Sequence, residues 1–210
     1  MHLSKTLWGS ALAGVAIAPV LVATTQLPPA TAAALPTVEI VGDAIVFTAA
    51  PGVDDGVIIF GAESGVLNFG GVTGSSFNTH TCTSNGCDIT GIDRVVVRLR
   101  DGNDVVYADI PWHVPPLRFV IHGGPGNDSI GGNAGHDDRL FGGAGDDWIR
   151  GYSGGDLIHG GRGHDVLRGG KGLDLICSAD GVADKVHGGL QFDTAYVDER
   201  DTVDGVEQLR

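Results

Sequence analysis

The sequence contains few basic residues, little glutamate and few aromatic side chains. Only 13 of its 210 residues are Lys or Arg, against 26 acidic residues, so the formal net charge is −13. This balance excludes a nucleic-acid-binding protein, which needs a basic surface. Only 4 of the acidic residues are Glu and 22 are Asp, while glycine supplies 35 positions. This composition excludes a helical bundle, because glycine and aspartate are poor helix formers.

Long apolar runs are scarce, and the longest lies at the N-terminus. Lys5 provides a positive start, residues 7–22 are apolar, and small residues at 30–34 provide cleavage sites. This pattern predicts a secretory signal peptide over residues 1–34. A membrane anchor is the alternative, but the run is short for a span of about 20 residues, and Gly14 and Pro19 interrupt it. We therefore expect a secreted, extracellular protein with no membrane span after signal removal.

The sequence has three cysteines. Cys82 and Cys87 flank four residues that include Asn85-Gly86, a strong signal for a tight turn. A hairpin would place the two sulfur atoms across neighbouring strands, and export favours a disulfide between them over two separate thiols. Cys177 is then unmatched, so it is either a small packed residue or a site of intermolecular pairing.

Nine-residue repeats dominate the sequence after His122. The first copy is GGPGNDSIG from Gly123, and four tandem copies follow from Gly142: GGAGDDWIR, GYSGGDLIH, GGRGHDVLR and GGKGLDLIC. Between them lies GNAGHDDRLF from Gly132, with one extra residue that we place after its first aspartate. Aspartate therefore recurs at the sixth position and an aliphatic residue two places later. The sixth-position residues, with those of two degenerate copies at the end, are Asp128, Asp137, Asp147, Asp156, Asp165, Asp174, Asp184 and Asp193.

This pattern resembles the GGxGxDxUx nonapeptide of RTX-type, or haemolysin-type, calcium-binding repeats. More widely, the chain resembles small exported calcium-binding proteins of Gram-positive bacteria. The resemblance implies an all-β fold, a parallel β-roll in which two repeats complete one coil. Three residues of each repeat should form a strand, with the middle side chain pointing inward, and six should turn the chain. Aspartates two repeats apart would then stack in two columns.

The resemblance also implies Ca²⁺ as the cofactor, with the eight sixth-position aspartates as ligands. Stacked carboxylates repel one another, and calcium removes this repulsion by taking six to eight oxygens from carboxylates and backbone carbonyls. Zinc would need Cys or His in a small tetrahedral set, which the His residues do not provide. The expected carbonyl ligands belong to glycines of the tandem copies, namely Gly143, Gly145, Gly161, Gly163, Gly170 and Gly172.

The segments on either side of the repeats are predicted to be rich in strands or to close the roll. Residues 35–122 should form a small β-rich N-terminal region that contains the Cys82–Cys87 hairpin, residues 123–197 the calcium-binding β-roll, and residues 198–210 a C-terminal cap. Short Val- and Ile-rich runs bounded by Gly, Asp and Pro predict the strands of the first segment. Asp104 is either a first calcium ligand or part of a plain turn. The predicted strands are 37–41, 44–48, 57–60, 66–69, 94–99 and 117–122.

No motif in the sequence requires an enzyme. Residues 151–155 match the GxSxG nucleophile motif, but Ser153 is only a variable repeat position, and the motif needs a strand-to-helix turn. We therefore expect a non-enzymatic, exported protein that binds several calcium ions and folds on binding them outside the cell. The alternatives are a calcium-stiffened adhesion or interaction protein with an extracellular or cell-surface protein partner, and a small secreted hydrolase with its site in residues 35–122.

Overall fold

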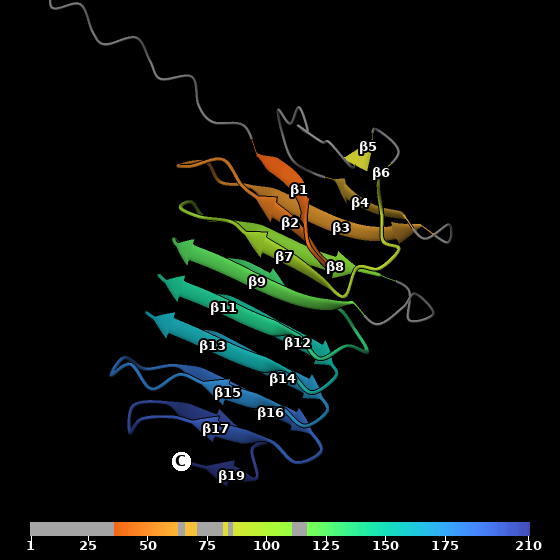
Figure 1. Ribbon diagram of the computed structural model, residues 1–210. Helices are drawn as coiled ribbons and strands as arrows, with labels where there is room; N and C mark the ends of the chain where they lie inside the picture. The colour runs from red at the N-terminus through yellow and green to blue at the C-terminus, as the bar shows by residue number, and fades with distance from the viewer. Residues whose placement is uncertain (1–35, 63–65, 71–81, 84–85, 111–116) are drawn as a thin grey trace, which may run out of the picture. The chain divides into compact units, whose positions relative to one another are not determined.

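The computed structural model describes residues 36–62, 66–70, 82–83, 86–110 and 117–210, and within these residues every regular element is a β-strand (Figure 1). The strands form two sheets whose members alternate along the chain, so that consecutive strands of the repeats lie in opposite sheets. The all-β fold predicted from the composition and the repeats is confirmed.

The first sheet contains nine strands, and parallel pairing prevails from β2 onward. In their spatial order they are β1 (Thr37–Val41), β2 (Ala44–Thr48), β7 (Arg94–Arg98), β9 (Arg118–Pro125), β11 (Arg139–Ala144), β13 (Leu157–Arg162), β15 (Leu175–Cys177), β17 (Thr194–Tyr196) and β19 (Gln208–Leu209).

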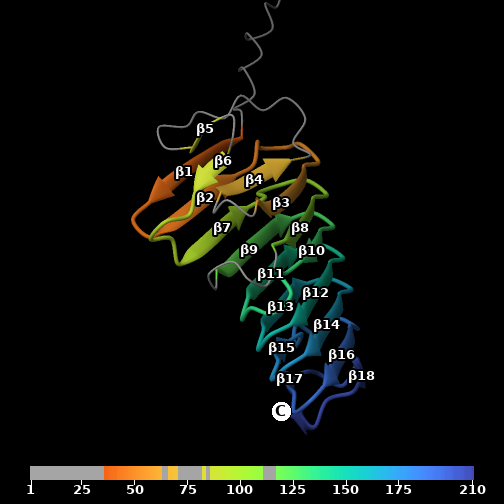
Figure 2. The same ribbon diagram turned by 90° about the vertical axis from the view of Figure 1, so that its right-hand side faces the viewer.

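The second sheet contains ten strands and runs in the opposite chain order. They are β18 (Thr202–Asp204), β16 (Lys185–Leu190), β14 (Val166–Lys171), β12 (Trp148–Ser153), β10 (Ser129–Gly131), β8 (Val105–Asp109), β3 (Gly56–Ala62), β4 (Val66–Gly70), β6 (Gly86–Asp88) and β5 (Cys82–Thr83). Figure 2 shows the same stack from the side.

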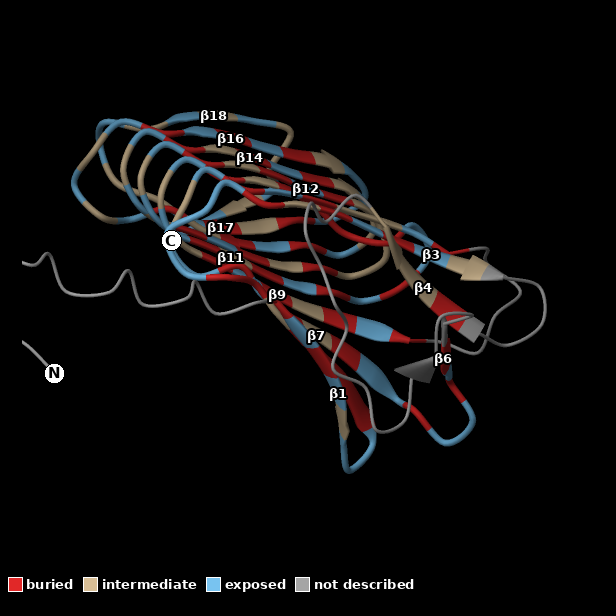
Figure 3. Cartoon of the chain, turned by 90° about the horizontal axis from the view of Figure 1, so that it is seen from above, coloured by how far each residue is buried: buried red, intermediate tan, exposed pale blue. Residues whose placement is uncertain are grey.

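One strand from each sheet makes one coil of a parallel β-roll. The register pairs residues two repeats apart, as in Ile149 with Leu167 and in Leu140 with Ile158. These aliphatic side chains point inward and are fully buried, while their neighbours on either side point outward (Figure 3). The core of the repeats is therefore a thin double row with one aliphatic side chain per strand.

The strands of the repeats are longer than the three residues expected. β12 and β14 each contain six residues, which leaves three for the turn. In β11 and β13 the pairing skips one position, between Phe141–His159 and Gly143–Gly161, and then resumes. Because the chain bends at the first glycine of the repeat without leaving the ladder, the second and third positions extend the strand.

The segment before the repeats belongs to the same two sheets. β7 pairs in parallel with β9, and β3 pairs with β8, which pairs with β10. All six predicted strands of this segment are present, whereas β8 was missed. The sequence boundary at residue 123 therefore separates coils that lack the glycine-rich motif from coils that have it, within one pair of sheets.

The predicted cysteine hairpin is only partly described. β5 and β6 are antiparallel and place Cys82 opposite Cys87, as a hairpin disulfide requires. The side chain of Cys82 lies outside the described residues, so the disulfide stays a prediction. Cys177 is a half-buried free cysteine on the outer face of the first sheet, between His159 and Tyr196.

The C-terminal residues supply the last strand of each sheet, since β18 pairs with β16 and β19 pairs with β17. The predicted signal peptide, residues 1–34, lies outside the described residues. Among the residues that are described, no helix has the length and apolar character needed to cross a membrane.

Candidate metal centre

The aspartate two residues before each inward aliphatic side chain lies at the turn into the strand, where it is buried. Asp147 precedes Ile149 and Asp165 precedes Leu167 in this way. Because the coils are in register, these aspartates stack in two columns, one at each edge of the roll. The first column contains Asp128, Asp147, Asp165 and Asp184, and the second contains Asp138, Asp156, Asp174 and Asp193.

Hydrogen bonds link the members of each column. The backbone N–H of Asp128 donates to Oδ1 of Asp147 at 2.8 Å, and that of Asp147 donates to Oδ1 of Asp165 at 2.9 Å. In the second column the N–H of Asp156 donates to Oδ1 of Asp174 at 2.8 Å. Each carboxylate therefore accepts from the preceding coil, and the side chain fixes the stacking of the two backbones.

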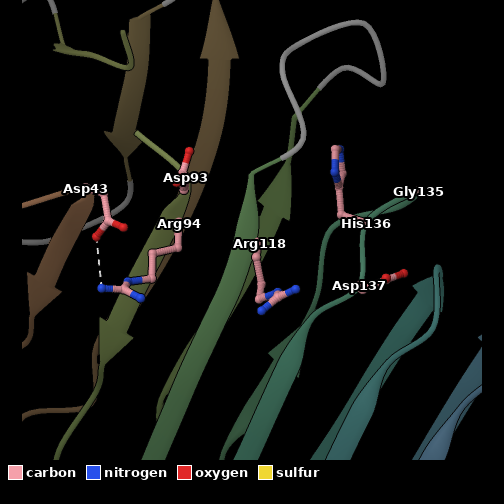
Figure 4. A pocket seen from close by; sticks show the side chains of 7 residues that line it. All are labelled: Asp43, Asp93, Arg94, Arg118, Gly135, His136 and Asp137. Carbon is pink, nitrogen blue, oxygen red and sulfur yellow. Dashed lines mark hydrogen bonds and ion pairs between the residues drawn. The ribbon is translucent and has the colours of Figure 1, made fainter. Parts of the chain in front are cut away.

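Asp137 does not belong to the column in which the sequence placed it. It is exposed, lies beside the pocket of about 530 Å³ drawn in Figure 4, and accepts the N–H of Gly155. Asp138 takes the column position instead, because only Asp138 lies two residues before the inward Leu140. The extra residue of this repeat thus precedes the column aspartate. Unlike the other members, Asp138 also uses Oδ2, which accepts the N–H of Asn133 at 2.6 Å.

The second carboxylate oxygen of the seven other repeat aspartates is buried and accepts no hydrogen bond. Asp147 Oδ2 lies 2.2 Å from the position that a Cβ atom on Gly142 would occupy, and the carbonyl oxygen of Gly160 lies 2.5 Å from the same point. Gly169 shows the same arrangement with Asp174 Oδ2 and the carbonyl of Gly188. The first glycine of the repeat is therefore required because the carboxylate fills the space of a side chain.

These carbonyls differ from the ones expected. The oxygens of Gly143, Gly145 and Gly170 lie against the backbone of the equivalent glycine in the next coil, Gly161, Gly163 and Gly189 respectively. The carbonyls beside the unpartnered carboxylate oxygens belong to the first glycine of the following coil, which the sequence analysis did not name. The glycine repeat itself carried no signal for this choice, because every turn glycine offers a carbonyl.

A second ladder, also missed, runs outside the first column. The N–H of Asn127 donates to Oδ1 of Asn103, that of Asp146 to Oδ1 of Asn127, and that of His164 to Oδ1 of Asp146, each at 2.8 Å. These side chains accept from the following coil, the opposite direction to the inner column. The position varies among Asn, Asp and His, so only the short oxygen-bearing side chains could have indicated it.

Burial raises the pKa of the column carboxyls in the metal-free protein. Loss of hydration raises the pKa of Asp128 and Asp174 to about 6, of Asp147 and Asp184 to about 7, and of Asp156 to about 8. The backbone N–H that each carboxylate accepts opposes this shift, while neighbouring aspartates add to it for Asp147. An ionised column therefore requires a compensating positive charge.

The oxygens present fit a hard divalent cation. Within the described residues, no three Asp, Glu, His or Cys side chains converge on one point, but each unpartnered Oδ2 shares its space with backbone oxygen. Calcium accepts this mixture of carboxylate and carbonyl oxygens, whereas zinc prefers thiolate and imidazole. The fold and the columns together define a β-roll built for cations at its edges.

Comparison with known proteins identifies the repeats. Residues 120–138, 136–167 and 150–183 match the family model of the RTX calcium-binding nonapeptide repeat. No curated protein and no solved structure matches the chain. The protein thus carries RTX-type calcium-binding repeats, and the cofactor of these repeats is Ca²⁺.

Proposed function

We propose that the protein is an exported, non-enzymatic calcium-binding β-roll that binds several Ca²⁺ ions and folds on binding them. The observation that carries this proposal is the row of seven buried repeat carboxylates, each with one oxygen that accepts no hydrogen bond. A buried, unpaired carboxylate destabilises a fold unless a cation or a proton compensates it.

The residues that would hold calcium are the column aspartates from Asp128 to Asp193, through Oδ2, with carbonyls of the turn glycines. Oδ1 is already engaged by the backbone N–H of the preceding coil, so it orients the carboxylate while Oδ2 stays available. Bound calcium supplies positive charge and oxygen coordination between neighbouring coils. Since the ligands of one ion come from more than one coil, binding favours stacked coils over separate ones.

Export is the second part of the proposal. The signal-like residues 1–34 support it, and extracellular calcium modules work at roughly 10⁻⁴–10⁻³ M calcium, far above cytosolic levels. A chain that orders only in such calcium would stay unfolded during export and fold afterwards.

A non-enzymatic role agrees with the surroundings of Ser153. It ends β12 and its carbonyl accepts the N–H of Gly135, and the chain continues through a short turn into β13. The strand-to-helix turn of a nucleophile motif is thus not formed at this serine. We expect Ser153→Ala to leave every property of the protein unchanged.

One observation favours the adhesion or interaction role as a second candidate. Leu173, Leu190 and Phe192 lie at turns of the last repeats with 65%, 60% and 55% of their surface exposed. Exposed apolar side chains on one edge of a rigid roll suit a protein partner. Retention on intact cell walls in calcium, and its loss in Phe192→Asp, would support this role over calcium binding alone.

The main experiment is a calcium titration of the full chain followed by far-UV circular dichroism, with chelator as the zero point. We expect a cooperative gain of β signal at roughly 10⁻⁴–10⁻³ M calcium, and a poor response to magnesium, which demands a tight octahedron and keeps its waters. A β signal that is complete in chelator at neutral pH and does not change in millimolar calcium would contradict the proposal.

A further inference from the structure

The first aspartate column continues beyond the glycine-rich repeats. The backbone N–H of Asp104 donates to Oδ1 of Asp128 at 2.9 Å, and the N–H of Asp55 donates to Oδ1 of Asp104 at 2.6 Å. Both residues precede residue 120, where the match to the family repeat begins. The two coils before the repeats therefore extend the same column by two carboxylates.

Both carboxylates are buried and incompletely satisfied. Asp104 is 0% exposed and Asp55 is 4% exposed, and Oδ2 of each accepts no hydrogen bond. No Lys or Arg side chain of the described residues forms an ion pair with either. These two aspartates are thus in the same condition as Asp147 and Asp165 within the repeats.

The opposite end of the column is closed by the protein itself. Asp201 accepts the N–H of Asp184 through Oδ1 at 3.0 Å. Its Oδ2 accepts from the hydroxyl of Ser178 at 2.8 Å and from the N–H of Asp198 at 3.0 Å. Asp201 therefore needs no cation and acts as a cap, whereas the N-terminal end of the column leaves its oxygens unpartnered.

Oxygen donors gather at this N-terminal end. The carbonyl oxygen of Val53 and Oδ1 of Asp104 lie 2.4 Å and 3.0 Å from the place of a Cβ on Gly102. The outer ladder also reaches this coil, since the N–H of Asn103 donates to Oδ1 of Asp54 at 2.8 Å. The donors are carboxylate and carbonyl oxygens, the set that calcium prefers.

We propose that Asp55 and Asp104 hold a further calcium ion in the two coils that precede the repeats, an inference that rests on the proposed calcium-binding function. Ala50 and Leu99 lie five residues before these aspartates, where the repeats have glycine. Without the glycine corner, the site is more open to adjustment than those of the repeats and is the last to fill. Calcium then orders the N-terminal coils as well as the repeats.

The test counts calcium ions per full chain by equilibrium dialysis at saturating calcium. Asp104→Asn keeps the acceptor for the N–H of Asp55 and removes the charge, so we expect it to bind one ion fewer than the unmodified protein. Asp101→Asn makes the same charge change at an exposed position of the same coil and should leave the count unchanged. The titration of Asp104→Asn should also lack its weakest step.

An unchanged count in folded Asp104→Asn, or an equal loss in Asp101→Asn, would overturn the assignment. Should Asp104→Asn fail to give the β signal in calcium, Asp55→Asn, at the outer end of the column, provides the same comparison. Absence of calcium from the unmodified chain would instead refute the proposed function. Loss of ions in Asp147→Asn, with none lost in Asp104→Asn or Asp55→Asn, would refute only this inference.

Discussion

Replacing Asp147 by asparagine should stabilise the metal-free protein and weaken calcium binding. Oδ1 of Asp147 accepts the N–H of Asp128 at 2.8 Å, and an asparagine retains this acceptor. Oδ2 is buried without a partner beside the carbonyl of Gly160. The amide nitrogen of an asparagine would stand there as a donor, so the substitution removes a buried charge and adds a hydrogen bond.

The magnitude follows from the pKa of the carboxyl. Burial first, and then the charges of Asp128 and Asp165, raise the pKa of Asp147 from 3.8 to about 7. At 1.36 kcal/mol per pKa unit, ionisation of this group costs the metal-free fold roughly 4 kcal/mol above pH 7. We expect Asp147→Asn to recover about half of this or more in chelator at pH 8.

The assay is urea unfolding of the full chain by circular dichroism, in chelator and in saturating calcium. The gain in chelator should shrink toward zero as the pH falls to about 4, because both states of the carboxyl are then protonated. In calcium the sign should reverse, since one carboxylate ligand is lost. Asp109→Asn, the same charge change at an exposed position of β8, should alter neither condition strongly. A loss of stability in chelator at pH 8 would refute the reasoning.

Three further predictions concern glycine, backbone strain and pH. Gly142→Ala should destabilise the calcium-loaded protein by about 1–3 kcal/mol in urea unfolding, because its Cβ would overlap a carboxylate; Gly155→Ala, whose nearest atom is 3.2 Å away, should cost less. Gln191 is exposed at φ 88°, so Gln191→Gly should raise thermal stability by about 1 kcal/mol, and a fall would contradict the strain. In chelator the β signal should persist at pH 5 and fade as the pH rises from about 6 to about 8, since raised pKa values such as that of Asp156 favour the fold only while the carboxyls are protonated. A signal independent of pH in chelator would oppose this.

The repeat pattern predicted the roll and most of its columns because the same residue spacing sets both. A nine-residue period with aspartate two places before an aliphatic residue fixes which side chains are buried at each edge, and the register confirms it for Ile149 and Leu167. The strands Thr37–Val41 and Ala44–Thr48 also match their predicted bounds. Alternation of side chains and the bounding Gly and Asp residues were sufficient there.

What the sequence did not reveal depends on contacts between coils. The adjacent Asp137 and Asp138 are chemically equivalent in sequence, and only the inward position of Leu140 decides between them. β8 was missed because its Tyr107 and Asp109 face outward and leave only one fully buried side chain, Val106. The longer strands of the repeats arise from pairing that resumes after the glycine bend, which no local propensity encodes.

The balance between apolar burial and buried charge explains why a cation controls this fold. Each coil of the repeats buries one aliphatic side chain per sheet, such as Ile158 and Leu167, and each contributes about 1.5–3 kcal/mol. Each coil also buries two carboxylates, whose raised pKa values at Asp147 and Asp156 indicate an opposing free energy of similar size at neutral pH. The two contributions nearly cancel along the whole stack, because both recur once per repeat. Neutralising the columns therefore leaves the apolar contribution unopposed in every coil at once, and the fold responds cooperatively to calcium at neutral pH and to protons in acid.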